Sequence, residues 1–510
     1  MNNLVEKVRG VNLGGWLVVE GWIKPSLFDE IPNGDMLDGT KVQFKSVTLQ
    51  KYIVAENGGG SILSVDRSSA SAWETFSLWR VSESEFQFRT NGGQFLSCDG
   101  EGSYVSAMAN SPSTTETFYV ERNANKVHIR LLSGTYLQAT SSNQIIANYP
   151  GRPGWDDNMA TFEMTIVSDL RGDYQLANGH GPIKAKEVLE AHRSSFIAEN
   201  DFSFLSKNGI NTVRIPVGWW IVLDPNTPAP FVGGGVEYLD KAFSWAQTYN
   251  IKCIIDLHAA PGSQNGFEHS SSRDGFMEWA TPEHISQSLE VIDYLASRYA
   301  KHPALLGIEL LNEPTASGVP LDVLVSYYSR GYQIVRRYSS TAYVIFCERL
   351  GSDPLELFQA NIGSSNTVLD LHWYNLYSDS FKNMSVADNI EFIQNKRQTD
   401  IQRYNGANGP LIFIGEWVNE MEFQGATQSD YQNFGKAQLE AYNAGSFGWA
   451  YWSFKNVFQH WDLEWNIQNN HLLLGKYRFS SIYSFFIDTL EFISYPYPMQ
   501  VILQTYKFGG

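Results

Sequence analysis

Cysteine is scarce in this chain of 510 residues, which contains only Cys98, Cys253 and Cys347. Three widely separated cysteines provide neither a disulfide framework nor the spacing of a metal site. Basic charge is also in short supply, because 37 Lys and Arg face 54 Asp and Glu and leave a net charge of −17. This balance argues against nucleic acid or an anionic membrane as a partner.

Long apolar runs are absent from the sequence as well. No run approaches the roughly 20 residues needed to span a bilayer, so we expect no membrane span. The segment Met1 to Lys7 lacks the apolar region of a signal peptide, which favours a cytoplasmic location unless the chain is truncated at its start. Hydrophobic residues make up 43% of the chain, enough for a large core, and the length allows a barrel plus an extra module.

Two apolar stretches end abruptly in a carboxylate. Residues 306–314 read LGIELLNEP and residues 410–417 read PLIFIGEW. Both are typical of buried parallel strands that end at a working surface. One interpretation is that Glu313 and Glu416 only cap the helices that follow. The other is catalytic, since a glycosidase needs one carboxylic acid to protonate the leaving oxygen and one carboxylate to attack or to activate water.

Strand-like and helix-like segments alternate from residue 166 onward. Together with a first strand, they predict eight parallel strands with helices between them, the pattern of a (β/α)8 TIM barrel. The predicted strands are 8–17, 212–217, 252–258, 306–314, 342–347, 367–374, 410–417 and 447–454. The predicted helices are 185–204, 238–247, 282–299, 321–338, 389–404 and 429–443, the last with Ser429 as its N-cap.

Residues 39–165 differ in character, being rich in Gly, Ser, Thr and Asn with short alternating strands. A motif ending at Phe76 recurs 42 residues later, at Phe118, and again 44 residues after that, at Phe162. Three all-β units of this size predict a β-trefoil inserted after the first barrel strand, either a sugar- or protein-binding module or an inert spacer. Because such connections lie at the C-terminal face of a barrel, we expect the insert beside the catalytic cleft.

The predicted organisation therefore has four parts. Residues 1–38 form the first barrel strand and its loop, 39–165 the all-β insert, and 166–475 the remainder of the barrel. Residues 476–510 are aromatic and weakly charged and follow a complete barrel, so we expect an added helix or a disordered tail.

Side chains suited to sugar chemistry gather at the ends of the predicted strands. They are Glu20, Arg214, His258, Asn312, Glu313, His372, Tyr374, Glu416 and Trp452. Taken singly, the arginine is equally a structural ion-pair partner, the histidines are core residues and the tryptophan is core packing. The catalytic interpretation depends on their joint placement.

Each of these side chains has an expected role. Arg214 should keep the pKa of Glu416 low while Tyr374 hydrogen-bonds it, and burial with a neighbouring carboxylate should raise the pKa of Glu313 so that it holds a proton. Asn312 is expected to bind the sugar 2-hydroxyl. Trp452 is expected to form a floor under the sugar, and His258 and Glu20 to contact its hydroxyls. His372 is expected to support Glu313.

Six motifs together resemble glycoside hydrolase family five, in particular its exo-β-1,3-glucanase branch. They read NLGGWLVVE at 12–20, RIPVGW at 214–219, DLHAAPGSQN at 256–265, LNEP at 311–314, HWY at 372–374 and GEW at 415–417. The all-β insert resembles the fascin-like domain fused to plant members of that group. The resemblance implies a retaining double displacement without metal or cofactor, with Glu313 as acid/base and Glu416 as nucleophile about 5–5.5 Å apart.

The resemblance also implies binding residues and a location. Phe267 and Tyr377 match positions of an aromatic clamp for the +1 sugar, although the second is Phe in the fungal exoglucanases. Glu268 and His269 depart from the Asp-Asn pair of those enzymes, which leaves the linkage preference open. The implied glucose pocket at −1 is shaped by Glu20, His258, Asn312 and Trp452, and the implied location is the cell wall.

Three functions follow from these observations. The first is a retaining exo-β-1,3-glucanase or β-glucosidase that releases or transfers glucose from the ends of β-glucan oligosaccharides or β-glucosides. The second is a non-catalytic scaffold that binds glycans or actin, and the third an endo-acting β-mannanase or cellulase on the same barrel. The sequence does not identify a partner for the predicted trefoil.

Overall fold

The computed structural model describes residues 6–474, apart from 359, 361–362, 364 and 407–408. The chain divides into one compact unit, Met1–Leu472, and a second that begins at Leu473. The predicted C-terminal tail, 476–510, lies outside the described residues. Within the described part of the chain, no helix has both the length and the apolar character needed to cross a membrane.

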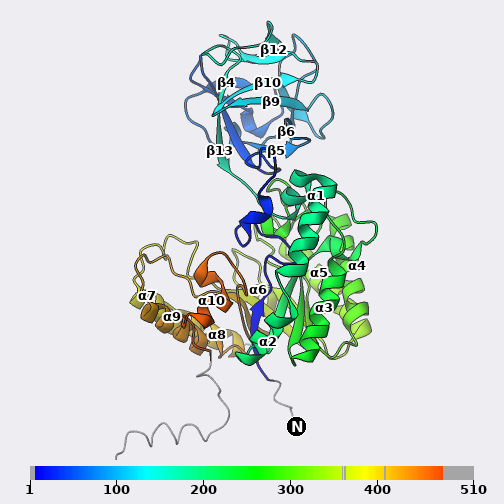
Figure 1. Ribbon diagram of the computed structural model, residues 1–510, viewed down its shortest axis with the longest axis vertical. Helices are drawn as coiled ribbons and strands as arrows, with labels where there is room; N and C mark the ends of the chain where they lie inside the picture. The colour runs from blue at the N-terminus through cyan, green and yellow to red at the C-terminus, as the bar shows by residue number, and fades with distance from the viewer. Residues whose placement is uncertain (1–5, 359, 361–362, 364, 407–408, 475–510) are drawn as a thin grey trace, which may run out of the picture. The chain divides into compact units, whose positions relative to one another are not determined.

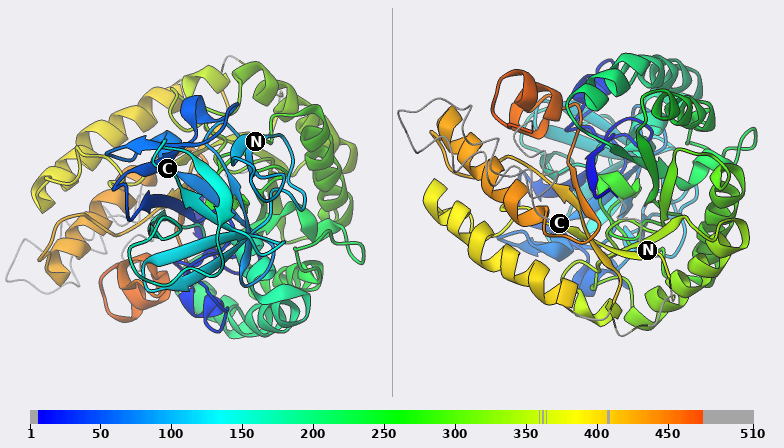
Figure 2. Two further views of the ribbon diagram at one scale, coloured as in Figure 1. Left: turned by 90° about the horizontal axis from the view of Figure 1, so that it is seen from above. Right: turned by 90° about the horizontal axis from the view of Figure 1, so that it is seen from below.

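Eight parallel strands close into a barrel in the order of the chain, which confirms the predicted (β/α)8 fold (Figures 1 and 2). Their side chains are almost all buried, because helices cover the outside of the barrel. The strands are β1 (Val8–Asn12), β14 (Thr212–Gly218), β15 (Lys252–Ala259), β16 (Leu305–Glu309), β17 (Tyr343–Cys347), β18 (Thr367–His372), β19 (Leu411–Trp417) and β20 (Gly448–Tyr451).

The helices surround these strands, as the right-hand view of Figure 2 shows. They are α1 (Asp173–Ser195), α2 (Glu199–Lys207), α3 (Gly235–Thr248), α4 (Pro282–Tyr299), α5 (Leu321–Tyr338), α6 (Leu355–Phe358), α7 (Val386–Phe392), α8 (Gln398–Gly406), α9 (Gln428–Tyr442) and α10 (Leu463–Gln468). A π-helical segment, Ile393–Arg397, joins α7 to α8. Short 3-10 turns follow β1 (Pro25–Phe28), β14 (Trp219–Val222), β15 (Glu268–Ser270) and β20 (Gln459–Trp461).

Several helix boundaries differ from the predictions, and two of them show why. Helix α1 begins at Asp173, well before the predicted start, and a kink at Gly181, whose φ is 74°, divides it before Pro182. Helix α9 is capped by Thr427, whose side chain accepts a hydrogen bond from the backbone N–H of Asp430, rather than by Ser429.

A separate β-rich domain occupies the chain between β1 and α1. Its strands are β2 (Lys41–Ser46), β3 (Tyr52–Val54), β4 (Ser64–Arg67), β5 (Phe76–Arg80), β6 (Glu85–Arg89), β7 (Phe95–Ser97), β8 (Ser106–Ala109), β9 (Phe118–Asn123), β10 (Lys126–Leu131), β11 (Tyr136–Ala139), β12 (Ile145–Tyr149) and β13 (Phe162–Ser168). The three repeated phenylalanines, Phe76, Phe118 and Phe162, are buried in one core. We call strands β2–β13 the β domain; its assignment as a fascin-like trefoil stays a prediction.

Candidate active site

The predicted glutamates stand at the C-terminal ends of two barrel strands. Glu416 is the next-to-last residue of β19, and Glu313 follows β16 in the turn that Pro314 completes. Glu313 has a φ of 45°, a left-handed backbone conformation that few non-glycine residues adopt. Such strained residues concentrate at functional sites. The parallel barrel brings both strand ends to one face.

Glu416 is held by hydrogen bonds at both carboxylate oxygens. Its Oε1 accepts from Nη1 of Arg214 at 3.1 Å, and its Oε2 accepts from the phenol of Tyr374 at 2.7 Å. The imidazole Nδ1 of His372 lies 3.4 Å from the same Oε2. The carboxylate is thereby fixed in one orientation without losing access to the cleft.

Arg214 is fully buried and its charge is shared among several partners. Nε and Nη2 donate to the two oxygens of Glu309 at 2.7 and 2.9 Å. The other donors reach Asn12 at 3.0 Å and Asn312 at 2.8 Å, in addition to Glu416. Because a bidentate contact to a carboxylate is the strongest that a guanidinium makes, Glu309 and not Glu416 is the main partner.

Two imidazoles contact Glu313, one from each side. Nδ1 of His372 lies 2.7 Å from Oε1, and Nε2 of His269 lies 3.1 Å from Oε2. Glu313, His372 and Glu416 each offer one atom within 4.8 Å of the others. One oxygen of each carboxyl group therefore lies within 4.8 Å of the other, which is nearer to the roughly 5–5.5 Å separation of retaining glycosidases than to the roughly 6.5–9.5 Å of inverting enzymes.

The charge balance at the two glutamates reverses the predicted one. Burial opposes ionisation of Glu313, but His269 and His372 outweigh it and hold the pKa of Glu313 well below its usual value. Burial raises the pKa of Glu416 to about 7, with Glu313 adding to the effect and His372 opposing it. Arg214 lowers it too little to prevent this, because other buried carboxylates share its charge.

His269 and Glu313 share a proton position. Burial disfavours a charged imidazole, but the contact with Glu313 raises the pKa of His269 to about 9. Nδ2 of Asn265 lies 3.0 Å from the same Nε2. Oδ1 of Asn265 accepts from the backbone N–H of Phe267 at 3.0 Å, so Nδ2 is the donor and favours a neutral imidazole. Nε2 of His269 thus faces one group that favours its protonation, Glu313, and one that opposes it, Asn265.

Several buried polar atoms near these glutamates have no hydrogen-bond partner among the described residues, and two of them belong to the predicted set. They are Nδ2 of Asn312 and Oε1 of Glu20. Because an unpaired buried polar atom costs free energy in the free protein, both are suited to hydrogen-bond a polar ligand. Burial raises the pKa of Glu20 to about 8, so this carboxyl is available as a donor at neutral pH.

An aromatic wall completes the pocket. The ring of Trp452 is stacked on His258, with centroids 5.4 Å apart and planes at 7°, and Nδ1 of His258 is 2.6 Å from Asp256. A Cβ atom on Gly14 would lie 2.8 Å from the Trp452 ring. The Gly-Gly turn after β1 thus leaves room for a flat indole, the surface on which sugars stack.

Phe267 and Tyr377 are the exposed members of the predicted set, with 49% and 76% of their surface accessible. The Phe267 ring lies 5.4 Å from that of His269. The Tyr377 ring lies 5.9 Å from that of Tyr374. Each exposed ring therefore adjoins a residue that contacts one of the two glutamates.

Sequence reasoning missed two members of the site, His269 and Glu309. His269 was noted only as a departure from the resembled enzymes. Glu309 lies within an apolar strand, where a carboxylate needs a buried cation such as Arg214. That position was the signal that could have found it.

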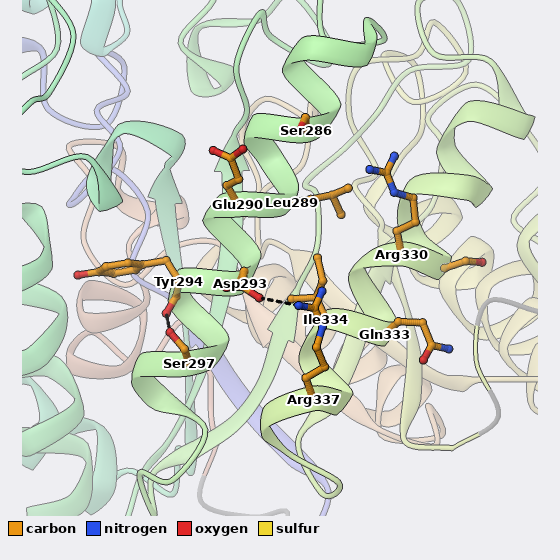
Figure 3. Close-up of a pocket in the computed structure, with 11 residues that line it drawn as sticks. Ser286, Leu289, Glu290, Asp293, Tyr294, Ser297, Arg330, Gln333, Ile334 and Arg337 are labelled. Atoms are coloured by element: carbon orange, nitrogen blue, oxygen red, sulfur yellow. Dashed lines mark hydrogen bonds and ion pairs between the residues drawn. The ribbon is translucent and has the colours of Figure 1, made fainter.

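A hollow of about 820 Å³ lies elsewhere, between α4 and α5 (Figure 3). Asp293 and Arg337 face each other across it at 3.4 Å. Among the described residues that line it there is no member of the predicted site. This hollow is therefore separate from the candidate site at the strand ends.

Comparison with known proteins agrees with this geometry. Residues 182–457 match the family model of cellulase (glycosyl hydrolase family 5). The chain belongs to glycosyl hydrolase family 5. It is thus an O-glycosyl hydrolase, and the proposal of a non-catalytic scaffold is set aside. Residues 33–167 match a domain of unknown function (DUF7910), which does not test the fascin-like resemblance.

Individual relatives of this family 5 enzyme include glucan-degrading proteins. A probable glucan 1,3-beta-glucosidase A of Aspergillus niger is 31% identical over 320 residues, covering 56% of this chain and 76% of that protein. A glucan 1,3-beta-glucosidase of Schwanniomyces occidentalis is 32% identical over 335 residues, covering 57% and 76%. A solved rutinosidase of Aspergillus niger shares the fold, with a TM-score of 0.51 and 23% identity over 59% of this chain and 88% of that one.

Proposed function

We propose that this enzyme is a retaining, exo-acting β-glucosidase that removes glucose from the ends of β-1,3-glucan oligosaccharides or related β-glucosides. The decisive observation is the spacing of the two glutamates, whose nearest atoms lie within 4.8 Å. Water cannot fit between a sugar and a carboxylate at this separation, so one glutamate attacks the sugar itself. The names of the curated relatives support glucose as the sugar.

In the proposed mechanism the ionised form of Glu416, which a pKa of about 7 leaves well populated at neutral pH, attacks the anomeric carbon while Glu313 protonates the glycosidic oxygen. The bond to the leaving sugar breaks, and a glucosyl ester of Glu416 forms. Glu313, now ionised, takes a proton from water, which attacks the ester and releases β-glucose. A sugar hydroxyl in place of water gives transglucosylation.

The sugar is held by groups that the structure leaves unpartnered. Nδ2 of Asn312 is buried and free of partners among the described residues, and we assign it to the 2-hydroxyl. That contact strengthens as charge develops on the ring in the transition state. Glu20 and His258 bind further hydroxyls, and Trp452 forms the floor of the pocket.

His269 supplies the proton that Glu313 needs. In the free enzyme the proton rests on the imidazole, because the pKa of Glu313 is low beside two histidines. Bound substrate excludes water and disfavours the separated charges. Transfer of the proton across 3.1 Å from His269 then converts Glu313 into the acid.

The assay is time-resolved NMR of laminaritriose with purified enzyme. We expect β-glucose to appear first, one unit at a time, and Glu416→Ala to reduce the rate by roughly 10⁴-fold or more, as loss of a nucleophile does. Glu290→Ala, on the exposed side of α4, is the matched control and should retain full activity.

Other products would contradict specific parts of the proposal. An early α-anomer would refute retention, and early long oligosaccharides would favour the endo-acting alternative. Full activity of Glu416→Ala would refute the assignment of the nucleophile.

Location at the cell wall is a further part of the proposal. It is supported by the expected polymeric substrate and by Asn383, which lies in an exposed loop before Ser385 and could accept a glycan in a secretory pathway. Mass spectrometry of the native protein tests this. An unmodified Asn383 together with cytosolic fractionation would contradict it.

A further inference from the structure

The connection between β15 and α4 carries Phe267 and His269 but has little regular structure. In its 263–278 segment, here called the substrate loop, the only regular element described is the 3-10 turn Glu268–Ser270. Ser263 and Ser271 have φ values of 59° and 52°, a region unfavourable for non-glycine residues. Long connections of this kind are mobile unless other parts of the protein anchor them.

The barrel anchors the first half of the substrate loop. The backbone N–H of Arg171 donates to Glu268 at 3.0 Å. Nε2 of Gln175, in α1, donates to the carbonyls of Ser272 and Arg273 at 2.8 and 3.0 Å. The barrel also holds the end of the loop, where the hydroxyl of Thr315 donates to Sδ of Met277 at 3.1 Å. Asp274 lies between these two sets of contacts.

The β domain anchors the second half through Asp274, which is 3% exposed. Oδ2 of Asp274 accepts from Nε1 of Trp79, in β5, at 2.5 Å and from Nη1 of Arg89, in β6, at 2.9 Å. The hydroxyl of Ser77 donates to its backbone carbonyl at 3.4 Å. One loop residue thus accepts from three side chains of the β domain, two at its carboxylate and one at its backbone carbonyl.

Arg89 holds more of the loop than Asp274 alone. Its guanidinium lies 3.8 Å from the centre of the Phe276 ring, and Nη2 is 3.0 Å from Glu278. In return, Arg273 of the loop stacks on Trp79 at 3.5 Å. Since Arg89 and Asp274 are largely shielded from water, their contact is stronger than an exposed ion pair.

A shift at Asp274 would reach the sugar-binding part of the loop. An added Cβ on Gly266 would lie 2.6 Å from the carbonyl oxygen of Gly275, so the two arms of the loop touch. The N–H of Ser272 donates to the carbonyl of Phe267 at 3.2 Å. The arm that the β domain holds therefore positions the arm that carries Phe267 and His269.

We propose that the β domain braces the substrate loop through Arg89, Trp79 and Asp274, and so positions Phe267 and His269 for the leaving sugar. This inference rests on the proposed function for its effect on activity, though not for its effect on the loop. It gives the domain a role within the enzyme. Arg89, Trp79 and Asp274 are positioning residues, since none contacts the glutamates.

The test compares two substrates in Arg89→Ala. Cleavage of laminaritriose needs both the acid and a binding place for the leaving sugar. Cleavage of β-glucosyl fluoride needs neither, so its rate depends only on the −1 pocket and on Glu416. We expect kcat/KM for laminaritriose to fall about tenfold or more, because misplacing a group by about 1 Å costs up to about 100-fold. The value for the fluoride should stay within about twofold of wild type. Equal losses on both substrates would overturn the proposal.

Arg130→Ala is the matched control. Arg130 stacks on Tyr119 at 4.0 Å and pairs with Glu121 at 3.4 Å within the β domain, so its loss tests general weakening of that domain. It should leave the substrate ratio unchanged. The conservative variant Arg89→Lys, which keeps the charge, should recover part of the activity on laminaritriose.

Hydrogen exchange of the amides of 263–278 provides a readout that does not depend on activity. Arg89→Ala should accelerate exchange there and Arg130→Ala should not. Unchanged exchange in Arg89→Ala would overturn the brace. An inactive wild-type enzyme would instead contradict the proposed function and leave the exchange result to decide the brace.

Discussion

Replacement of Glu20 by Gln should stabilise the protein, and increasingly so as the pH rises. Glu20 is 3% exposed, and within the described part of the chain its carboxyl accepts one side-chain hydrogen bond, from Nε1 of Trp22 at 3.0 Å. Burial raises its pKa from 4.5 to about 8, with His269 opposing and Glu268 adding to the rise. In the unfolded chain the same carboxyl ionises freely.

The magnitude follows from linkage between proton binding and folding. A carboxyl whose pKa is higher in the folded state favours folding less as the pH rises from the unfolded pKa to the folded one. At 1.36 kcal/mol per pH unit, the penalty is about 1 kcal/mol at pH 5 and about 3 kcal/mol at pH 7, and it levels off near pH 8. Gln has no such penalty at any pH.

The assay is the difference in Tm between Glu20→Gln and wild type at pH 5, 6, 7 and 8. We expect a small gain at pH 5 that grows steadily to pH 8, while Glu290→Gln, an exposed change of the same chemistry, gives no trend. A gain independent of pH, or a loss at pH 8, would refute the reasoning. Glu20→Gln should also bind sugar more weakly, because a residue that lowers stability is normally retained for its function.

Three further variants test the glutamate cluster. Glu313→Ala should slow laminaritriose cleavage by roughly 10²- to 10⁴-fold. The variant should still be glucosylated by β-glucosyl fluoride, which is seen as a burst of released fluoride. Loss of the burst would contradict the role of Glu313 as the acid. His269→Asn removes the imidazole that keeps its proton up to high pH. The basic limb of the pH profile of kcat/KM should therefore move to lower pH. A basic limb at the wild-type pH would exclude His269 as the proton source. Arg214→Lys breaks the bidentate contact to Glu309. It should lower the free energy of unfolding, measured by urea titration, by about 3 kcal/mol, as the loss of a partner does in other buried pairs. An unchanged free energy of unfolding would contradict the buried network.

The barrel and its two glutamates were predictable because the signal is carried by single stretches of sequence. An apolar run that ends in Asn-Glu-Pro or Gly-Glu-Trp can hardly be anything but a buried strand reaching a polar surface. The closed barrel then brings those ends together without further information. Fold and glutamate positions thus follow from local pattern plus topology.

The charge balance was not predictable, because it depends on which groups share each partner. Arg214 was expected to serve Glu416, but Glu309 takes its two best donors. Glu313 was expected to lie near another carboxylate with His372 in support, but His269 contacts its other oxygen as well. The position of His269 is set by the substrate loop, whose path depends on contacts with residues that are distant in the sequence.

The segment that joins the sugar site to the β domain argues that the domain is an integral part of the enzyme. A module carried only for an outside partner is normally connected by an exposed linker with few contacts. Here Met36, Leu37 and Asp38 are buried. Oδ1 of Asp38 accepts from Arg273 of the substrate loop at 2.8 Å and from the backbone of Arg80 in the β domain at 3.2 Å.

The other oxygen of Asp38 accepts from Nδ2 of Asn178, in α1, at 2.6 Å. A single buried carboxylate therefore joins the barrel, the β domain and the loop that carries His269. Burying it costs free energy unless every one of these donors is present, so the three parts depend on one another for a common geometry. The same chain segment begins at Glu20, so the β domain follows directly in the chain on a residue of the candidate site.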